Sequence, residues 1–110
     1  MAKAAGVSAP LRADGSLALG TSEASPLDIA TGYATFAREG TFVRTTGMSL
    51  VQDRSGRTMF RNQKAGDRGG RRAVSGEVAG GVIEAMKEVV RIGTGRPARL
   101  TGYTTWGKTG

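Results

Sequence analysis

The sequence contains neither cysteine nor histidine, and these two absences exclude several kinds of site. Without cysteine the chain can form no disulfide and no thiolate metal site. Without histidine it lacks the commonest general base and the commonest zinc ligand, so we expect no metal and no cofactor. Aromatic residues make up only 5% of the 110 residues, whereas glycine occurs 18 times, so any hydrophobic core should be thin for this length.

Long apolar runs are also absent, whereas positive charge is plentiful. No stretch approaches the length of a membrane span, and the first twenty residues lack the apolar block of a signal peptide. Sixteen basic against nine acidic residues give a net charge of +7, which is compatible with nucleic acid, an anionic surface or a bacterial envelope protein. The basic stretch 61–72 carries no aromatic residues that could stack on bases. We therefore predict an exposed, solvated loop there and no nucleic-acid partner.

A first helix is predicted to begin at Pro26. Ser25 precedes this proline and stands three residues before Asp28, which is the pattern of an N-cap, a first-turn proline and an acidic residue at the positive end of the helix dipole. Gly40 lies where a left-handed C-cap is expected. The apolar residues that recur at helical spacing, and that we expect to face the core, are Leu27, Ala30, Tyr33 or Ala34, and Ala37.

A hairpin and a second helix should follow. Residues 47–53 and 58–60 read as two short strands joined by the turn D-R-S-G at 53–56, in which glycine supplies a positive φ. Ser75 is the predicted N-cap of a helix whose last residue is Ile92 and which Gly93 terminates. Its apolar stripe consists of Val78, Val82, Ile83, Met86, Val89 and Val90. This order of elements indicates an α+β fold with helices packed on an antiparallel sheet.

The last nine residues, G-Y-T-T-W-G-K-T-G at 102–110, allow two interpretations. Gly102, Gly107, Lys108 and Thr109 match the phosphate-binding loop G-x-x-x-x-G-K-[ST], which requires a helix immediately afterwards. Alternatively, Lys108, Thr109 and Gly110 form a Lys-Thr-Gly triplet on a strand, as in the serine enzymes that recognise penicillin. The aromatic and β-branched residues 103–106 favour a strand running into the triplet, and the sequence offers no helix after it. A nucleotide-binding module and a basic interaction module remain alternatives.

Several segments together resemble the transpeptidase domain of penicillin-binding proteins, most closely that of the class A bifunctional peptidoglycan synthases. The resemblance covers residues 2–110 except the stretch 61–72, and its segments occur in the family's order. They are L-G-T-S-E-A-S-P-L at 19–27, Y-A-T-F-A at 33–37 with Gly40, D-R-S-G-R at 53–57, V-V-R-I-G-T-G-R at 89–96, and G-K-T-G at 107–110.

The resemblance implies a chemistry for the triplet. Family members acylate a serine with a D-Ala-D-Ala stem peptide and pass the acyl group to an amine on a neighbouring strand, and β-lactams acylate the same serine. By resemblance, Lys108 places positive charge near the substrate carboxylate and polarises the proton-transfer network, and Thr109 donates a hydrogen bond to that carboxylate. Gly110 would leave room for the substrate backbone along the strand edge.

The sequence also departs from the family pattern. The family's nucleophile lies in S-x-x-K and its second motif is S-x-N, and none of the seven serines has lysine three residues on or asparagine two residues on. We therefore expect residues 1–110 to be a fragment of a transpeptidase domain, inactive alone and unstable alone. Its parent protein should be anchored in the cytoplasmic membrane and should act on the periplasmic side. Trp106 occupies a position that is usually small, which should narrow the approach to the triplet.

Overall fold

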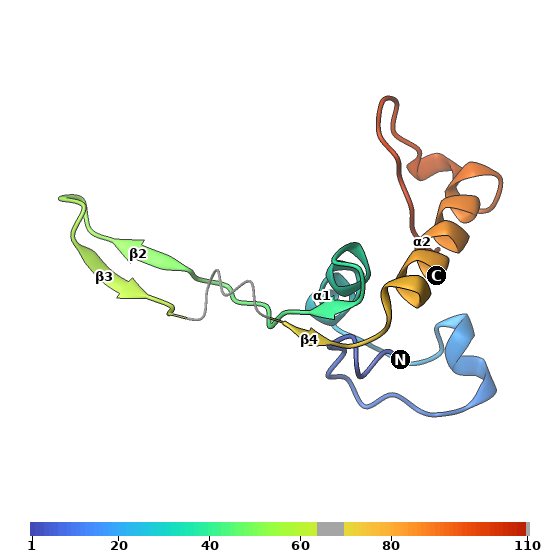
Figure 1. Cartoon of the computed structure of the whole chain (residues 1–110), viewed down its shortest axis with the longest axis horizontal. Coiled ribbons are helices and arrows are strands. Elements are labelled where there is room, and N and C mark those ends of the chain that lie inside the picture. The colour runs from blue at the N-terminus through green and yellow to red at the C-terminus, as the bar shows by residue number, and fades with distance from the viewer. Residues whose placement is uncertain (64–69, 110) are drawn as a thin grey trace.

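The computed structural model of the chain describes residues 1–63 and 70–109 (Figure 1). Within them the strands pair only in antiparallel fashion, β1 with β4 and β2 with β3. Helix α1 packs against β1 and against α2, which confirms the predicted α+β class with helices beside antiparallel strands. In chain order the elements are the 3-10 turn η1 (Gly15–Leu19), α1 (Pro26–Ala37), β1 (Thr41–Phe42), β2 (Leu50–Gln52), β3 (Thr58–Arg61), β4 (Arg71–Arg72), α2 (Gly76–Arg91) and the 3-10 turn η2 (Arg96–Ala98).

Helix α1 begins at Pro26, as predicted, and its first turn also holds the N-terminal segment. The Ser25 hydroxyl accepts a hydrogen bond from the Asp28 amide, while the Asp28 carboxylate accepts from the Ser25 amide, which completes a capping box. The other carboxylate oxygen accepts from the amide and the hydroxyl of Ser8, at 2.6 and 2.7 Å. These hydrogen bonds, led by that of the Ser8 amide, hold the pKa of the Asp28 carboxyl far below its usual range.

The buried face of α1 differs from the predicted apolar stripe. The buried residues are polar or small, namely Asp28, Thr31, Gly32 and Thr35, whereas Leu27 is 63% exposed. The hydroxyl of Thr35 donates a hydrogen bond to the Ala5 carbonyl at 2.9 Å. The prediction was wrong here because the N-terminal segment packs on this face through polar contacts, which helical spacing of apolar residues does not reveal. The apolar residues of α1 consequently remain partly open.

Helix α2 (Gly76–Arg91) agrees with the prediction in its N-cap and, to within one residue, in its ends. The Ser75 hydroxyl accepts a hydrogen bond from the Val78 amide at 3.2 Å, and the helix ends at Arg91. Its stripe is only partly covered, since Val90 is buried but Val78 is 40% exposed. None of the helices in the described residues is both long enough and apolar enough to cross a membrane.

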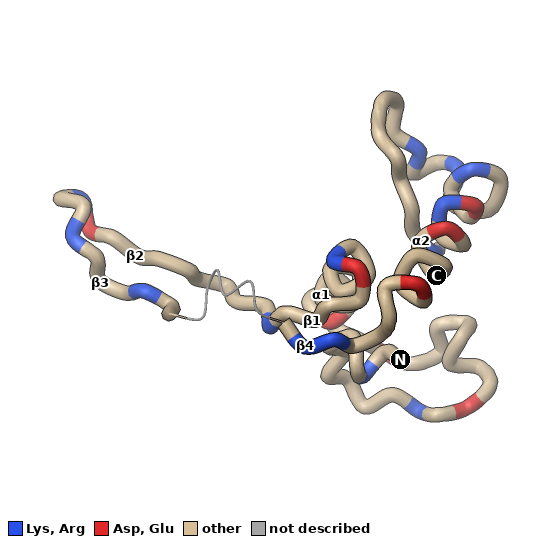
Figure 2. The backbone as a smooth tube through the Cα atoms, viewed as in Figure 1, with Lys and Arg blue, Asp and Glu red and all other residues tan. Residues whose placement is uncertain are grey.

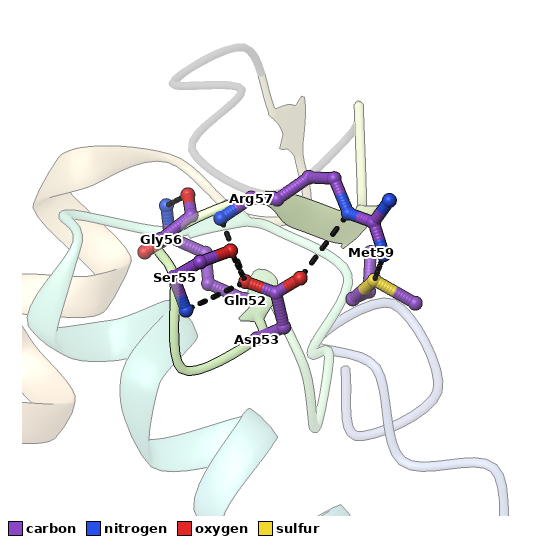
Figure 3. A network of polar contacts seen from close by, with 6 residues as sticks. All are labelled: Gln52, Asp53, Ser55, Gly56, Arg57 and Met59. Atoms are coloured by element: carbon purple, nitrogen blue, oxygen red, sulfur yellow. Dashed lines mark hydrogen bonds and ion pairs between the residues drawn. The ribbon is translucent and has the colours of Figure 1, made fainter.

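The predicted hairpin is confirmed as β2 and β3. Figure 3 shows its turn, in which the Asp53 carboxylate accepts hydrogen bonds from the Ser55 amide and hydroxyl and from the Arg57 amide. The Arg57 guanidinium also pairs with this carboxylate at 3.1 Å. Hydrogen bonds from Ser55 and Arg57 lower the pKa of the Asp53 carboxyl, so the turn is fixed by an ionised aspartate.

The predicted loop at 61–72 is only partly a loop. Arg61 is the last residue of β3, and Arg71–Arg72 form β4, which pairs with Thr41–Phe42 of β1. The Arg71 guanidinium lies 5.2 Å from the centre of the Phe42 ring, a distance at which a cation is attracted to the ring face. The expectation failed because pairing with a strand thirty residues upstream is not encoded in local composition. Residues 64–69 lie outside the described part of the chain.

The described residues bury little apolar surface. The buried apolar residues are Ala5, Ala79 and Val90, and the radius of gyration is 16.8 Å, against about 13 Å for a compact domain of this length. Figure 1 shows the reason, since the β2–β3 hairpin projects away from the two helices. The hairpin carries exposed apolar residues on both faces, including Leu50, Met59 and Phe60. As the composition indicated, the core is thin.

Candidate substrate-binding segment

Residues 103–109 form no strand. The last four of them, 106–109, contain Lys108 and Thr109, contact both helices and are the candidate substrate-binding segment. The predicted strand at 103–106 is therefore wrong for the described residues. β-Branched and aromatic residues favour an extended backbone, but a strand also requires a neighbour that pairs with its amides and carbonyls. Here the neighbours are helices and a turn. Gly110, the last residue of the predicted triplet, lies outside the described residues.

The helices bind two backbone amides, that of the first residue of the triplet and that of the glycine before it. The Lys108 amide donates to the Tyr33 hydroxyl of α1 at 3.0 Å, and the Gly107 amide donates to the Met86 carbonyl of α2 at 3.4 Å. The first bond joins residues that are 75 positions apart in the sequence. These two bonds hold the segment against both α1 and α2, and they fix the position of the backbone at Lys108.

A stacked pair of aromatic rings makes a further contact between α1 and this segment. The rings of Tyr33 and Trp106 lie 5.4 Å apart, centre to centre, with 12° between their planes. Such an offset parallel arrangement is favourable beyond the area that it buries. The large side chain of Trp106 is therefore packed against α1.

The side chains of the triplet have polar partners close by. The hydroxyl oxygens of Thr109 and Thr94 lie 2.6 Å apart, and Thr94 belongs to the glycine-rich turn that follows α2. The Lys108 ammonium group contacts the carbonyl of Thr109 and forms no ion pair with any carboxylate of the described residues. Lys108 is exposed and Thr109 is half-buried. A cation and a hydroxyl group next to one another can bind a carboxylate.

The geometry does not form a phosphate-binding loop. In such a loop several backbone amides point at the anion from the start of a helix, but no helix begins within residues 102–109, and the amides of Gly107 and Lys108 already have protein acceptors. Nor do the basic residues gather on one element: Figure 2 shows them over the β2–β3 hairpin, β4, α2 and the loop after it. Among the described residues no group of acidic side chains could hold a metal ion.

Comparison with known proteins identifies the family. The family model described as the penicillin binding protein transpeptidase domain matches residues 2–110. The chain belongs to the penicillin-binding protein transpeptidase family.

Relatives in the genus Neisseria agree with this assignment to the transpeptidase family. Penicillin-binding protein 1A of Neisseria meningitidis serogroup A is 36% identical over 105 residues, which cover 94% of this chain and 13% of the relative. The proteins of the same name from Neisseria gonorrhoeae and Neisseria flavescens are 36% and 37% identical, over 86% of this chain and 12% of theirs. The chain thus spans about an eighth of the length of the curated transpeptidase relatives that it matches.

Two residues of this transpeptidase segment were not singled out as site residues by sequence reasoning. Tyr33 was named only as a candidate core position and within the Y-A-T-F-A segment, and Thr94 only within the segment at 89–96. The available signal for Tyr33 was its phenol group, because a tyrosine on the inner face of a helix usually finds a partner for its hydroxyl. No feature of the sequence around Tyr33 identified the Lys108 amide as that partner.

Proposed function

We propose that this chain is the part of a D,D-transpeptidase that receives the carboxylate of a D-Ala-D-Ala stem peptide, or of a β-lactam, at Lys108 and Thr109. The observation that carries the proposal is the position of these two residues: an ammonium group and a hydroxyl on adjacent residues, with the backbone of Lys108 held by α1 and that of the preceding Gly107 held by α2. Membership of the transpeptidase family supports the same assignment. Gly110 would complete the triplet beside the substrate backbone.

The proposed reaction is acyl transfer in two steps through a serine ester. The serine hydroxyl attacks the carbonyl carbon of the penultimate D-alanine, its proton passes to the leaving amine, and the terminal D-alanine departs. An amine of a neighbouring peptide strand then attacks the ester carbonyl and forms an amide, and a proton from this amine passes to the serine oxygen, which is released as the free hydroxyl. In the first step Lys108 would attract the carboxylate of the terminal D-alanine, and Thr109 would orient it by a hydrogen bond. This carboxylate leaves with the terminal D-alanine, so in the second step Lys108 would act only by polarising the proton-transfer network.

The nucleophile must come from outside these 110 residues, because none of the seven serines lies in S-x-x-K. We therefore propose a longer parent enzyme that supplies S-x-x-K and S-x-N. It would be held at the cytoplasmic membrane and would cross-link peptidoglycan on the periplasmic side. The 1A penicillin-binding proteins of Neisseria, which are about eight times as long as the matched segment, support a larger parent.

Covalent labelling by a fluorescent penicillin tests this function. We expect the parent enzyme to give a labelled band that excess unlabelled penicillin abolishes, and the 110-residue chain at the same concentration to give none, since it has no acyl-accepting serine. A labelled band from the short chain would refute the assignment of the nucleophile to another part of the protein. A parent enzyme that fails to label would refute the proposed function itself.

A further inference from the structure

Tyr33 makes two contacts of different kinds with the candidate substrate-binding segment. Its hydroxyl accepts a hydrogen bond from the Lys108 amide at 3.0 Å, and its ring stacks on that of Trp106, with 5.4 Å between the ring centres. The two contacted residues flank Gly107, so a single side chain of α1 restrains the backbone on both sides of that glycine. Tyr33 is only half-buried, and it lies at the edge of an apolar cavity lined by α1 and the N-terminal segment.

Restraint is needed at this place because glycine has more backbone freedom than any other residue. Rotation about φ and ψ of Gly107 would move Lys108 and Thr109 together, so their side chains would have no fixed direction. The usual restraint on an extended segment is a ladder of hydrogen bonds with a neighbouring strand, and the described residues provide none for residues 103–109. The contacts of Tyr33, together with the Met86 carbonyl, take that role here.

We propose that Tyr33 is a positioning residue for Lys108 and Thr109: its hydroxyl and ring fix the direction in which these side chains meet the substrate carboxylate. Tyr33 itself touches no reacting atom. This inference rests on the proposed function, because it assumes that the segment binds a carboxylate. It also gives Trp106 a role, since the ring at this usually small position supplies the surface on which Tyr33 stacks.

The test compares two substitutions of tyrosine in the full-length parent enzyme. Tyr33→Phe keeps the ring and removes the hydroxyl, whereas the matched control Tyr103→Phe removes a hydroxyl from a residue that is 76% exposed. Acylation is followed by intact-protein mass spectrometry with benzylpenicillin and with its methyl ester, and each rate is separated into initial binding and the covalent step. The ester lacks the negative charge that Lys108 and Thr109 would recognise.

We expect Tyr33→Phe to weaken the initial binding of benzylpenicillin by roughly 3- to 10-fold, the effect of one lost hydrogen bond. The same substitution should change binding of the ester by less than about twofold, and Tyr103→Phe should affect neither compound. Trp106→Ala should weaken binding of the acid by roughly 2- to 10-fold, with recovery in Trp106→Phe, because phenylalanine restores a stacking partner.

Three outcomes would overturn the inference, and they are distinct from failure of the proposed function. If Tyr33→Phe binds both compounds as tightly as the wild type does, the hydroxyl does not position Lys108 and Thr109. If it weakens the acid and the ester equally, its role is general folding. If Trp106→Ala is without effect, the stacked ring is not needed. Failure of the proposed function would appear earlier, as a wild-type parent enzyme that benzylpenicillin does not acylate.

Discussion

Replacing Lys108 by alanine is expected to lower the rate of acylation of the parent enzyme by penicillin roughly 100- to 1000-fold, the loss typical of removing one pre-organised electrostatic group from an active site. The ammonium group of Lys108 has no carboxylate partner among the described residues, so its charge is available to a ligand. Lys108→Arg should recover part of the rate because it keeps the charge but not the compact shape of the ammonium group. The measurement is the second-order rate constant of labelling by a fluorescent penicillin.

Lys87→Ala is the matched control for Lys108. Lys87 lies on α2, is half-buried and forms an ion pair with the exposed Glu84 at 2.6 Å, and pairs with a solvent-exposed partner contribute little. Its replacement should leave the labelling rate within about twofold of the wild type. If Lys108→Ala were as mild as this control in a protein that remains folded, Lys108 would not be the carboxylate-binding cation.

Replacing Gly40 by alanine is expected to destabilise the fold by about 3 kcal/mol or more, which combines backbone strain with overpacking. Gly40 is buried between α1 and β1 and has φ = +86°, a region that other residues adopt only with strain. A Cβ at this position would lie 2.4 Å from the Val74 carbonyl oxygen. That oxygen belongs to the backbone that leads into α2, so it cannot simply rotate away. The melting temperature of the parent enzyme is the measurement.

Gly80→Ala provides the comparison for Gly40. Gly80 lies within α2, and a Cβ there would meet no atom within 4 Å. Alanine at such a helical position should stabilise the protein by about 1 kcal/mol. The two substitutions add the same methyl group and are expected to change stability in opposite directions. If Gly40→Ala melts at the same temperature as the wild type, the close approach of the α1–β1 connection to the β4–α2 connection is unimportant for stability.

The helices could be predicted from the sequence because their signals are local. Ser25 and Ser75 cap the helices by bonding to amides three residues away, and the D-R-S-G turn at 53–56 is fixed by bonds within four residues. The family resemblance was carried by such segments, and the family comparison confirmed it. Local signals therefore predicted both helices and the hairpin between them.

What the sequence could not supply were contacts between distant segments. The pairing of Arg71–Arg72 with Thr41–Phe42, the bonds from Ser8 to Asp28 and the bond from Lys108 to Tyr33 all join residues at least twenty positions apart. None leaves a periodic trace in composition. The same reason explains the incorrect strand at 103–106, because strand formation depends on a partner that the residues themselves do not specify. The sequence named Lys108 and Thr109 as candidates, but it did not name the residues that hold them in place.

The central claim is that Lys108 and Thr109 receive the carboxylate of the substrate, and a crystal structure of the parent enzyme acylated by a β-lactam tests it most directly. The account predicts the carboxylate of the bound drug within hydrogen-bonding distance of the Thr109 hydroxyl, with the Lys108 ammonium group next to it, and Tyr33 still bound to the Lys108 amide. A drug carboxylate bound by other residues, with Lys108 and Thr109 out of contact, would contradict the account.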